Sequence, residues 1–203
     1  MFHNMVKKIT DYMIKKNIIE EEMFEVYQYG FELMISSALS MISIMVIACL
    51  MDSFFIGLLY FFISIPLKVT AGGYHASTYA RCFIISNLEY IVLSLTAKML
   101  SAFLLPYYIW IILLFISISY ILPNCPVRNP NHPVAEDVLQ RNRRLAFILL
   151  GIDTLIITVL YLLLQESYLL NFSVLSIAFI AIFILPAKIR KEEISYDRSI
   201  YSE

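Results

Sequence analysis

The stretch LMISSALSMISIMVIACLM, residues 33–51, contains 19 residues and no Asp, Glu, Lys or Arg. About 20 helical residues cross the roughly 30 Å hydrocarbon core of a bilayer, so this run is long enough to span a membrane. Three more charge-free runs follow, at residues 53–67, 99–127 and 167–187. Two further apolar segments tolerate one acid each: 83–97 with Glu89, and 145–165 with Asp153.

Composition supports the same interpretation. The chain has 203 residues, of which 60% are hydrophobic, and its mean hydropathy is +0.77. Soluble domains hold about 45–50% apolar residues, and a water-soluble core of this size cannot hide the excess. We therefore expect an all-α polytopic membrane protein with about six transmembrane helices, at 33–51, 53–67, 83–97, 100–122, 145–165 and 167–187.

The distribution of basic residues predicts the orientation. If both termini are cytoplasmic, every one of the 15 Lys and Arg residues except Lys98 lies on the inner side. Cytoplasmic enrichment of basic residues is the usual orientation signal. The net charge of −1, by contrast, says nothing about partners. The first span follows a charged segment and begins near residue 33, which argues against a cleavable signal peptide.

We expect one integral membrane domain, residues 1–203, made of an N-terminal segment (1–32), the spans (33–187) and a cytoplasmic tail (188–203). In the first segment, apolar residues such as Met5, Ile9 and Met13 recur at helical spacing, which predicts an amphipathic helix on the inner membrane surface. A solvated arm is the alternative. The acids after residue 19 are expected to interrupt this helix. Segment 53–67 is short for a span, so it is tilted, short or re-entrant.

Residues 123–144, PNCPVRNPNHPVAEDVLQRNRR, differ from their surroundings. Four prolines exclude a regular helix from the first half. A helical pattern begins at Val134, with Glu136 and Asp137 near its start and arginines near its end, a polarity that suits the helix dipole. The simplest interpretation is a cytoplasmic loop whose arginines mark the membrane boundary.

The segment AGGYHASTYARC, residues 71–82, collects the side chains with chemical potential. Two glycines allow unusual backbone angles and close approach. Ser77 or Thr78 is suited to cap a following helix, which puts Cys82 in or just beyond its first turn. There the positive end of the helix and the neighbouring Arg81 favour the thiolate, the nucleophilic form of cysteine. His75 is then a candidate base or ion-pair partner.

Spacing imposes a condition on that pairing. On one uninterrupted helix, residues seven apart lie about 10.5 Å from each other along the axis. His75 and Cys82 therefore meet only if the chain turns between them.

Other interpretations of these residues stay open. The cysteine can be a small apolar residue at a helix end, and the histidine an interfacial anchor. A zinc site from His75, Cys82, Cys125 and His132 is conceivable, but it lacks the usual ligand spacing. Structural disulfides are not expected, because Cys82 and Cys125 face the reducing cytoplasm in this topology and Cys49 lies in a span. We expect no metal and no cofactor.

The segment AGGYHASTYARC, followed by the proline-rich CPVRNPNHP and the basic QRNRR, resembles the accessory gene regulator protein B (AgrB) family. Members are bacterial membrane cysteine endopeptidases that mature quorum-sensing peptides. Length, number of spans and order agree over nearly the whole chain. The resemblance implies that His75 and Cys82 are the catalytic pair and that no metal or cofactor takes part. Arg128 departs from the acid expected in the downstream loop.

The resemblance also implies the substrate: a propeptide with an amphipathic leader, a central Cys or Ser, and an acidic C-terminal tail. Cleavage through an acyl-enzyme thioester would release the tail, and ring closure would give a thiolactone or lactone. The active site would lie on the cytoplasmic side of the bacterial cell membrane. A homodimer is compatible with the sequence but not required by it.

Candidate substrate-binding residues are Gly72, Gly73, Arg81, Glu89, Arg141, Arg143, Arg144, Lys188, Arg190 and Lys191. The basic ones are placed to hold an acidic tail, although topology and lipid headgroups explain them equally well. Glu89, inside a span, either orients His75 or makes a polar contact between helices. Two rival functions remain: a small transporter whose path is lined by Glu89 and Asp153, and a non-catalytic scaffold that presents a peptide.

Overall fold

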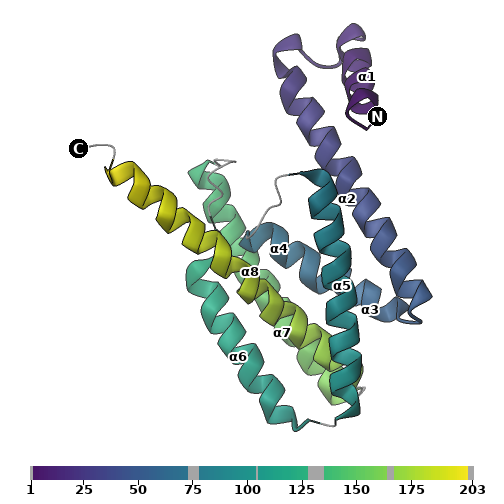
Figure 1. The fold of residues 1–203 in the computed structure, drawn as a ribbon, viewed down its shortest axis with the longest axis vertical. Coiled ribbons are helices and arrows are strands. Elements are labelled where there is room, and N and C mark those ends of the chain that lie inside the picture. Colours follow the sequence, from purple (N-terminus) through teal and green to yellow (C-terminus); the bar gives the residue numbers. More distant parts are fainter. Residues whose placement is uncertain (1, 73–77, 104, 128–134, 164–166, 201–203) are drawn as a thin grey trace.

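The computed structural model describes residues 2–72, 78–103, 105–127, 135–163 and 167–200 (Figure 1). Within these ranges the chain forms helices and no strand. Six helical segments are long and apolar enough to cross a membrane: Glu21–Leu50, Phe54–Ala71, Tyr79–Ala102, Tyr107–Asn124, Glu136–Leu163 and Tyr168–Leu185. The predicted polytopic helical fold with six spans is confirmed, and the protein is a multi-pass membrane protein.

The N-terminal segment is a separate helix, as predicted. Helix α1 (Phe2–Lys15) lies beside the N-terminal part of α2 (Phe24–Leu50) and packs against it (Figure 1). Val6 and Thr10, four residues apart on one face of α1, are fully buried. Helix α1 ends at Lys15, and a short 3₁₀ turn (Glu21–Met23) follows. Helix α2 then begins well before residue 33, where the sequence predicted the first span to start. The first span is therefore longer than its charge-free core.

The second span is one continuous helical segment with an irregular centre. It consists of α3 (Phe54–Leu59), a π-helical turn η2 (Tyr60–Ser64) and α4 (Ile65–Ala71). It extends beyond the predicted 53–67, because Lys68 lies inside the helix instead of ending it. Single π-helical turns are rare and often mark functional sites.

An aromatic cluster links three of the spans. The Tyr60 ring lies 5.5 Å from the Tyr90 ring and 6.4 Å from the Phe172 ring, measured between centroids, and all three side chains are almost fully buried. These rings come from η2, α5 (Tyr79–Ala102) and α8 (Ser167–Ile200). Edge-on packing of buried rings stabilises a contact beyond its buried area, so Tyr60 is held in a defined position.

Helix α8 is the centre of the bundle. It contacts α5, α6 (Tyr107–Asn124) and α7 (Glu136–Leu163), and it is the most deeply buried of the six spans. Its residues 171–174 are all buried, which is the pattern of a helix surrounded by protein. In α2, by contrast, most side chains of the span are exposed on the isolated chain, as expected for a helix that faces lipid.

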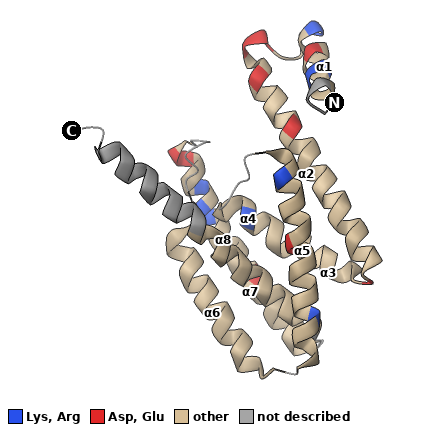
Figure 2. Ribbon diagram, viewed as in Figure 1, with Lys and Arg blue, Asp and Glu red and all other residues tan. Residues whose placement is uncertain are grey.

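Charged residues lie mainly near α1, the start of α2 and the starts of α5 and α7, while the rest of the bundle is nearly free of them (Figure 2). Arg81 lies in the first turn of α5 and Lys98 near its other end, so they are on opposite sides of one span. The predicted separation of Lys98 from the other basic residues is consistent with this arrangement. Helix α7 begins with Glu136 and Asp137, as the charge pattern predicted.

Candidate active site

The candidate active site lies where α4 ends and α5 begins. Helix α4 ends at Ala71, and Gly72 follows with a φ of +72°. Residues 73–77, which include Gly73 and His75, lie outside the described part of the chain. Thr78 is extended, with φ −142° and ψ 150°, so no unbroken helix runs from residue 75 to residue 82. A straight helix therefore does not keep His75 and Cys82 apart; their contact itself lies outside the described residues.

Cys82 occupies the fourth position of α5. Its backbone N–H donates to the carbonyl oxygen of Thr78 at 3.0 Å. The Thr78 hydroxyl oxygen accepts a hydrogen bond of 3.3 Å from the backbone N–H of Arg81, so Thr78 caps the helix as one of the two predicted capping residues. The side chain of Cys82 is exposed and is not in a disulfide. An exposed thiol at the start of a helix is accessible to a substrate carbonyl.

The two segments that stand out in the sequence meet at Gly72. The backbone N–H of Val127, in the proline-rich segment, donates a 2.9 Å hydrogen bond to the carbonyl oxygen of Ala71. A Cβ atom on Gly72 would lie 2.9 Å from the Val127 carbonyl oxygen, which is too close. The backbones of the two segments therefore approach each other at a point where only glycine fits. This contact requires Gly72 for packing, whether or not it also binds substrate.

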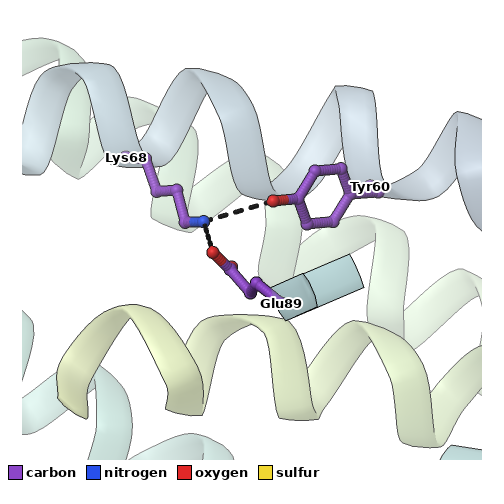
Figure 3. A network of polar contacts seen from close by, with 3 residues as sticks. All are labelled: Tyr60, Lys68 and Glu89. Atoms are coloured by element: carbon purple, nitrogen blue, oxygen red, sulfur yellow. Dashed lines mark hydrogen bonds and ion pairs between the residues drawn. The ribbon is translucent and has the colours of Figure 1, made fainter. Parts of the chain in front are cut away.

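A partly buried ion pair, one turn before Gly72, joins α4 to α5 (Figure 3). The Lys68 ammonium in α4 donates to a Glu89 carboxylate oxygen and, at 3.2 Å, to the Tyr60 hydroxyl oxygen. It also lies over the rings of Tyr60 and Phe183, 5.4 and 5.7 Å from their centroids. Glu89 is only 4% exposed, and its second carboxylate oxygen has no hydrogen-bond partner within the described part of the chain. Glu89 thus makes the expected polar contact between helices; its other expected role, orienting His75, involves a residue outside the described part of the chain.

The arginines predicted to bind a tail are on the first three turns of α7. Arg141, Arg143 and Arg144 are all exposed, and the Arg143 guanidinium lies 5.6 Å from the centre of the Phe147 ring. Arg81, on α5, is exposed as well. Lys188, Arg190 and Lys191 fall within α8, but their side chains are outside the described part of the structure. The side chains of Arg141, Arg143 and Arg144 thus lie on the exposed surface of α7.

The remaining cysteines differ from Cys82. Cys125, directly after α6, is 4% exposed, and burial raises the pKa of its thiol, while the nearby Arg143 guanidinium acts in the opposite direction. Cys49 is exposed near the end of α2. In the zinc hypothesis Cys125 and Cys82 share one ion, yet one is buried and the other exposed. His75 and His132 lie outside the described residues, and the rest of the described chain holds no cluster of three or more His, Cys, Asp or Glu.

Asp153 is separate from these groups. It is 1% exposed, and neither carboxylate oxygen has a hydrogen-bond partner among the described residues. Its neighbours on the buried face of α7 are Leu150 and Ile157, which belong to the apolar core. Glu89 therefore pairs with Lys68, whereas Asp153 lies beside the apolar core.

Two site residues were not identified from the sequence. Lys68 looked like the charge that ends a span, and Tyr60 looked like one aromatic residue among many. One signal in the sequence could have suggested the Lys68–Glu89 pair: a Lys ends one apolar run, and a Glu lies inside the next one.

These features define a class: a multi-pass helical membrane protein with an exposed cysteine at the start of a span, next to a glycine-containing loop. The chain belongs to the AgrB (accessory gene regulator B) family, whose sequence model matches residues 6–185. Comparisons with curated proteins and with solved structures gave no match. Family membership supports a role in the processing of a quorum-sensing propeptide.

Proposed function

We propose that this protein is a membrane-embedded cysteine endopeptidase that removes the C-terminal tail of a quorum-sensing propeptide and promotes closure of a peptide ring. The observation that carries the proposal is the exposed, free Cys82 thiol at the capped start of α5, inside the region matched by the family. His75, as the resemblance implies, is the second catalytic residue.

In the first step the Cys82 sulfur attacks the carbonyl carbon that joins the central segment of the propeptide to its tail. His75 accepts the thiol proton and then delivers it to the departing amine. The C–N bond breaks and a C–S bond forms. The products are a thioester between Cys82 and the central segment, and a released tail with a free amino group.

In the second step a nucleophile of the peptide resolves this thioester. If it is a cysteine, its sulfur attacks the thioester carbonyl, a thiolactone closes, and Cys82 regains its proton; a serine gives a lactone. Thioester exchange with a thiol is nearly balanced in energy, so cyclisation keeps an activated acyl group that hydrolysis would lose. Well-oriented intramolecular attack reaches effective molarities of about 10⁵ M or more, which favours the ring over attack by water.

The exposed arginines of α7 supply positive charge near this site for an acidic tail. Arg141 and Arg144 are the simplest candidates, since Arg143 also stacks on Phe147. Formation of a thioester from an amide is uphill, so capture or removal of the tail would pull the reaction forward. The same guanidinium groups also suit anionic lipid, and both roles can belong to one residue.

The test is co-expression with a candidate propeptide that has a central Cys or Ser and an acidic tail. Mass spectrometry should show loss of the tail with the wild type and none with Cys82→Ala or His75→Ala. Cys49→Ala is the matched control, because Cys49 is also exposed but lies near the opposite end of a different span. Cleavage that persists in both catalytic variants would exclude the pair. Substrate flux that survives Cys82→Ala would favour the transporter.

A further inference from the structure

We infer that the partly buried Lys68–Glu89 ion pair, together with Tyr60, is a positioning device that holds α4 against α5. In doing so it sets the position of Cys82 relative to Gly72. This inference rests on the proposed function, because it assigns these three residues to the same site.

The first argument is the free-energy cost of keeping ionisable groups inside a membrane span. Glu89 is 4% exposed, within a span, and the Lys68 side chain is 26% exposed. Ionisable residues inside a membrane are expensive and usually functional. Replacement of a buried ion pair by apolar residues of similar volume is often neutral or stabilising, so stability alone is a weak reason to keep one.

The second argument is the location of the pair along both helices. The Lys68 carbonyl oxygen accepts a hydrogen bond of 3.1 Å from the Gly72 N–H, so Lys68 lies one turn before the loop. Glu89 lies seven residues, or about 10.5 Å along the axis, after Cys82 and on the same face of α5. The ion pair therefore joins α4, one turn before Gly72, to α5, about two turns beyond Cys82.

The third argument is the rigidity of the anchor. The Tyr60 hydroxyl accepts from Lys68, and the Tyr60 ring is fixed against Tyr90 and Phe172. Tyr60 belongs to the π-helical turn, which is where the second span departs from regular geometry. These contacts fix the position of the Lys68 ammonium group. The Glu89 carboxylate is held in turn through its bond to that group.

A purely structural ion pair would predict something different. Its loss would lower stability, and activity would fall only in proportion to the folded fraction. A positioning pair instead affects the chemical step in protein that is folded. Misplacement of a nucleophile by about 1 Å can cost about 100-fold in rate, and it lowers kcat more than it raises KM.

The experiment compares Lys68→Met and Glu89→Gln with Lys68→Arg and with the charge-swapped double variant Lys68→Glu/Glu89→Lys. Full-length protein is purified in detergent, and three quantities are measured: the thermal unfolding midpoint, kcat and KM for tail release, and the alkylation rate of Cys82 relative to Cys49 in the same molecule. Asp153→Asn is the matched control, since it also neutralises a buried acid in a span.

We expect Lys68→Met and Glu89→Gln to lower kcat at least tenfold with KM changed less than threefold, and to change the Cys82:Cys49 alkylation ratio at least threefold. Lys68→Arg and the swapped pair should recover part of the lost kcat. A fall in activity that only follows the loss of folded protein, without recovery in either charged variant, would overturn the inference, as would wild-type kcat and alkylation in Glu89→Gln. If the wild type releases no tail, the proposed function fails, while the alkylation ratio still tests the positioning.

Discussion

The backbone N–H of Val127 donates a hydrogen bond to the carbonyl oxygen of Ala71, with 2.9 Å between nitrogen and oxygen. This single bond joins the end of the second span to the proline-rich segment that follows the fourth. The Ala71 carbonyl is at the C-terminal end of α4, where carbonyl groups have no partner within the helix. Val127 of the proline-rich segment therefore caps the C-terminal end of α4.

Gly72→Ala should disrupt this junction. Gly72 has a φ of +72° and a ψ of −171°, a conformation that is nearly restricted to glycine and costs other residues about 1–3 kcal/mol. The added Cβ would also meet the Val127 backbone, which cannot rotate away. We expect a lower thermal unfolding midpoint in detergent and a loss of tail release of tenfold or more.

Gly151→Ala is the control for this substitution. Gly151 lies within α7, and nothing is within 4 Å of the position of its Cβ, so alanine should be neutral or stabilise the helix by up to about 1 kcal/mol. Equal effects of the two substitutions would contradict the role assigned to Gly72.

Cys82 and Cys125 should react with a soluble alkylating reagent at very different rates. Cys82 is exposed at the start of α5, whereas Cys125 is buried and has a raised pKa. A raised pKa keeps the thiol protonated to higher pH, and the thiolate is the reactive form. We expect Cys82 to be alkylated at least tenfold faster than Cys125 at pH 7, with Cys125 gaining rate only at more alkaline pH. Peptide mass spectrometry over a pH series measures both sites, and the denatured protein, in which they should react alike, is the reference.

Thr78→Val should loosen the start of α5. Valine keeps the shape of threonine but removes the hydroxyl oxygen that accepts from the Arg81 N–H. Loss of a capping side chain costs about 1 kcal/mol, and the effect is local to the first turn. Amide hydrogen exchange at residues 81 and 82 should accelerate, and Thr78→Ser should retain protection. Unchanged exchange in Thr78→Val would show that the cap does not hold the helix that carries Cys82.

Asp153→Asn should leave tail release within twofold of the wild type. Asp153 is in the apolar core, and neither of its carboxylate oxygens has a hydrogen-bond partner among the described residues. An unpaired buried charge costs several kcal/mol. Asparagine has nearly the same shape as aspartate and cannot carry that charge. The thermal unfolding midpoint should therefore stay the same or rise. A large loss of activity in folded protein would give Asp153 a role that the present site does not include.

The sequence by itself determined the number and order of the spans, the separate N-terminal helix, and a helix start at Ser77 or Thr78, of which the structure shows Thr78. These features depend on hydropathy and capping, which act between residues close together in the chain. The spans came out longer than their charge-free cores because a lysine or glutamate with a partner, such as Lys68 or Glu89, does not end a helix.

Only the tertiary structure decided that Lys68 pairs with Glu89 and Tyr60, and that Val127 lies against Ala71 and Gly72. Each contact joins residues from different helices or loops, and it depends on how two helices are rotated and shifted relative to each other. In a membrane the apolar pattern indicates that a helix spans, but lipid and protein are similarly apolar, so the pattern does not specify which face meets which neighbour. That choice is made by the packing of the whole bundle.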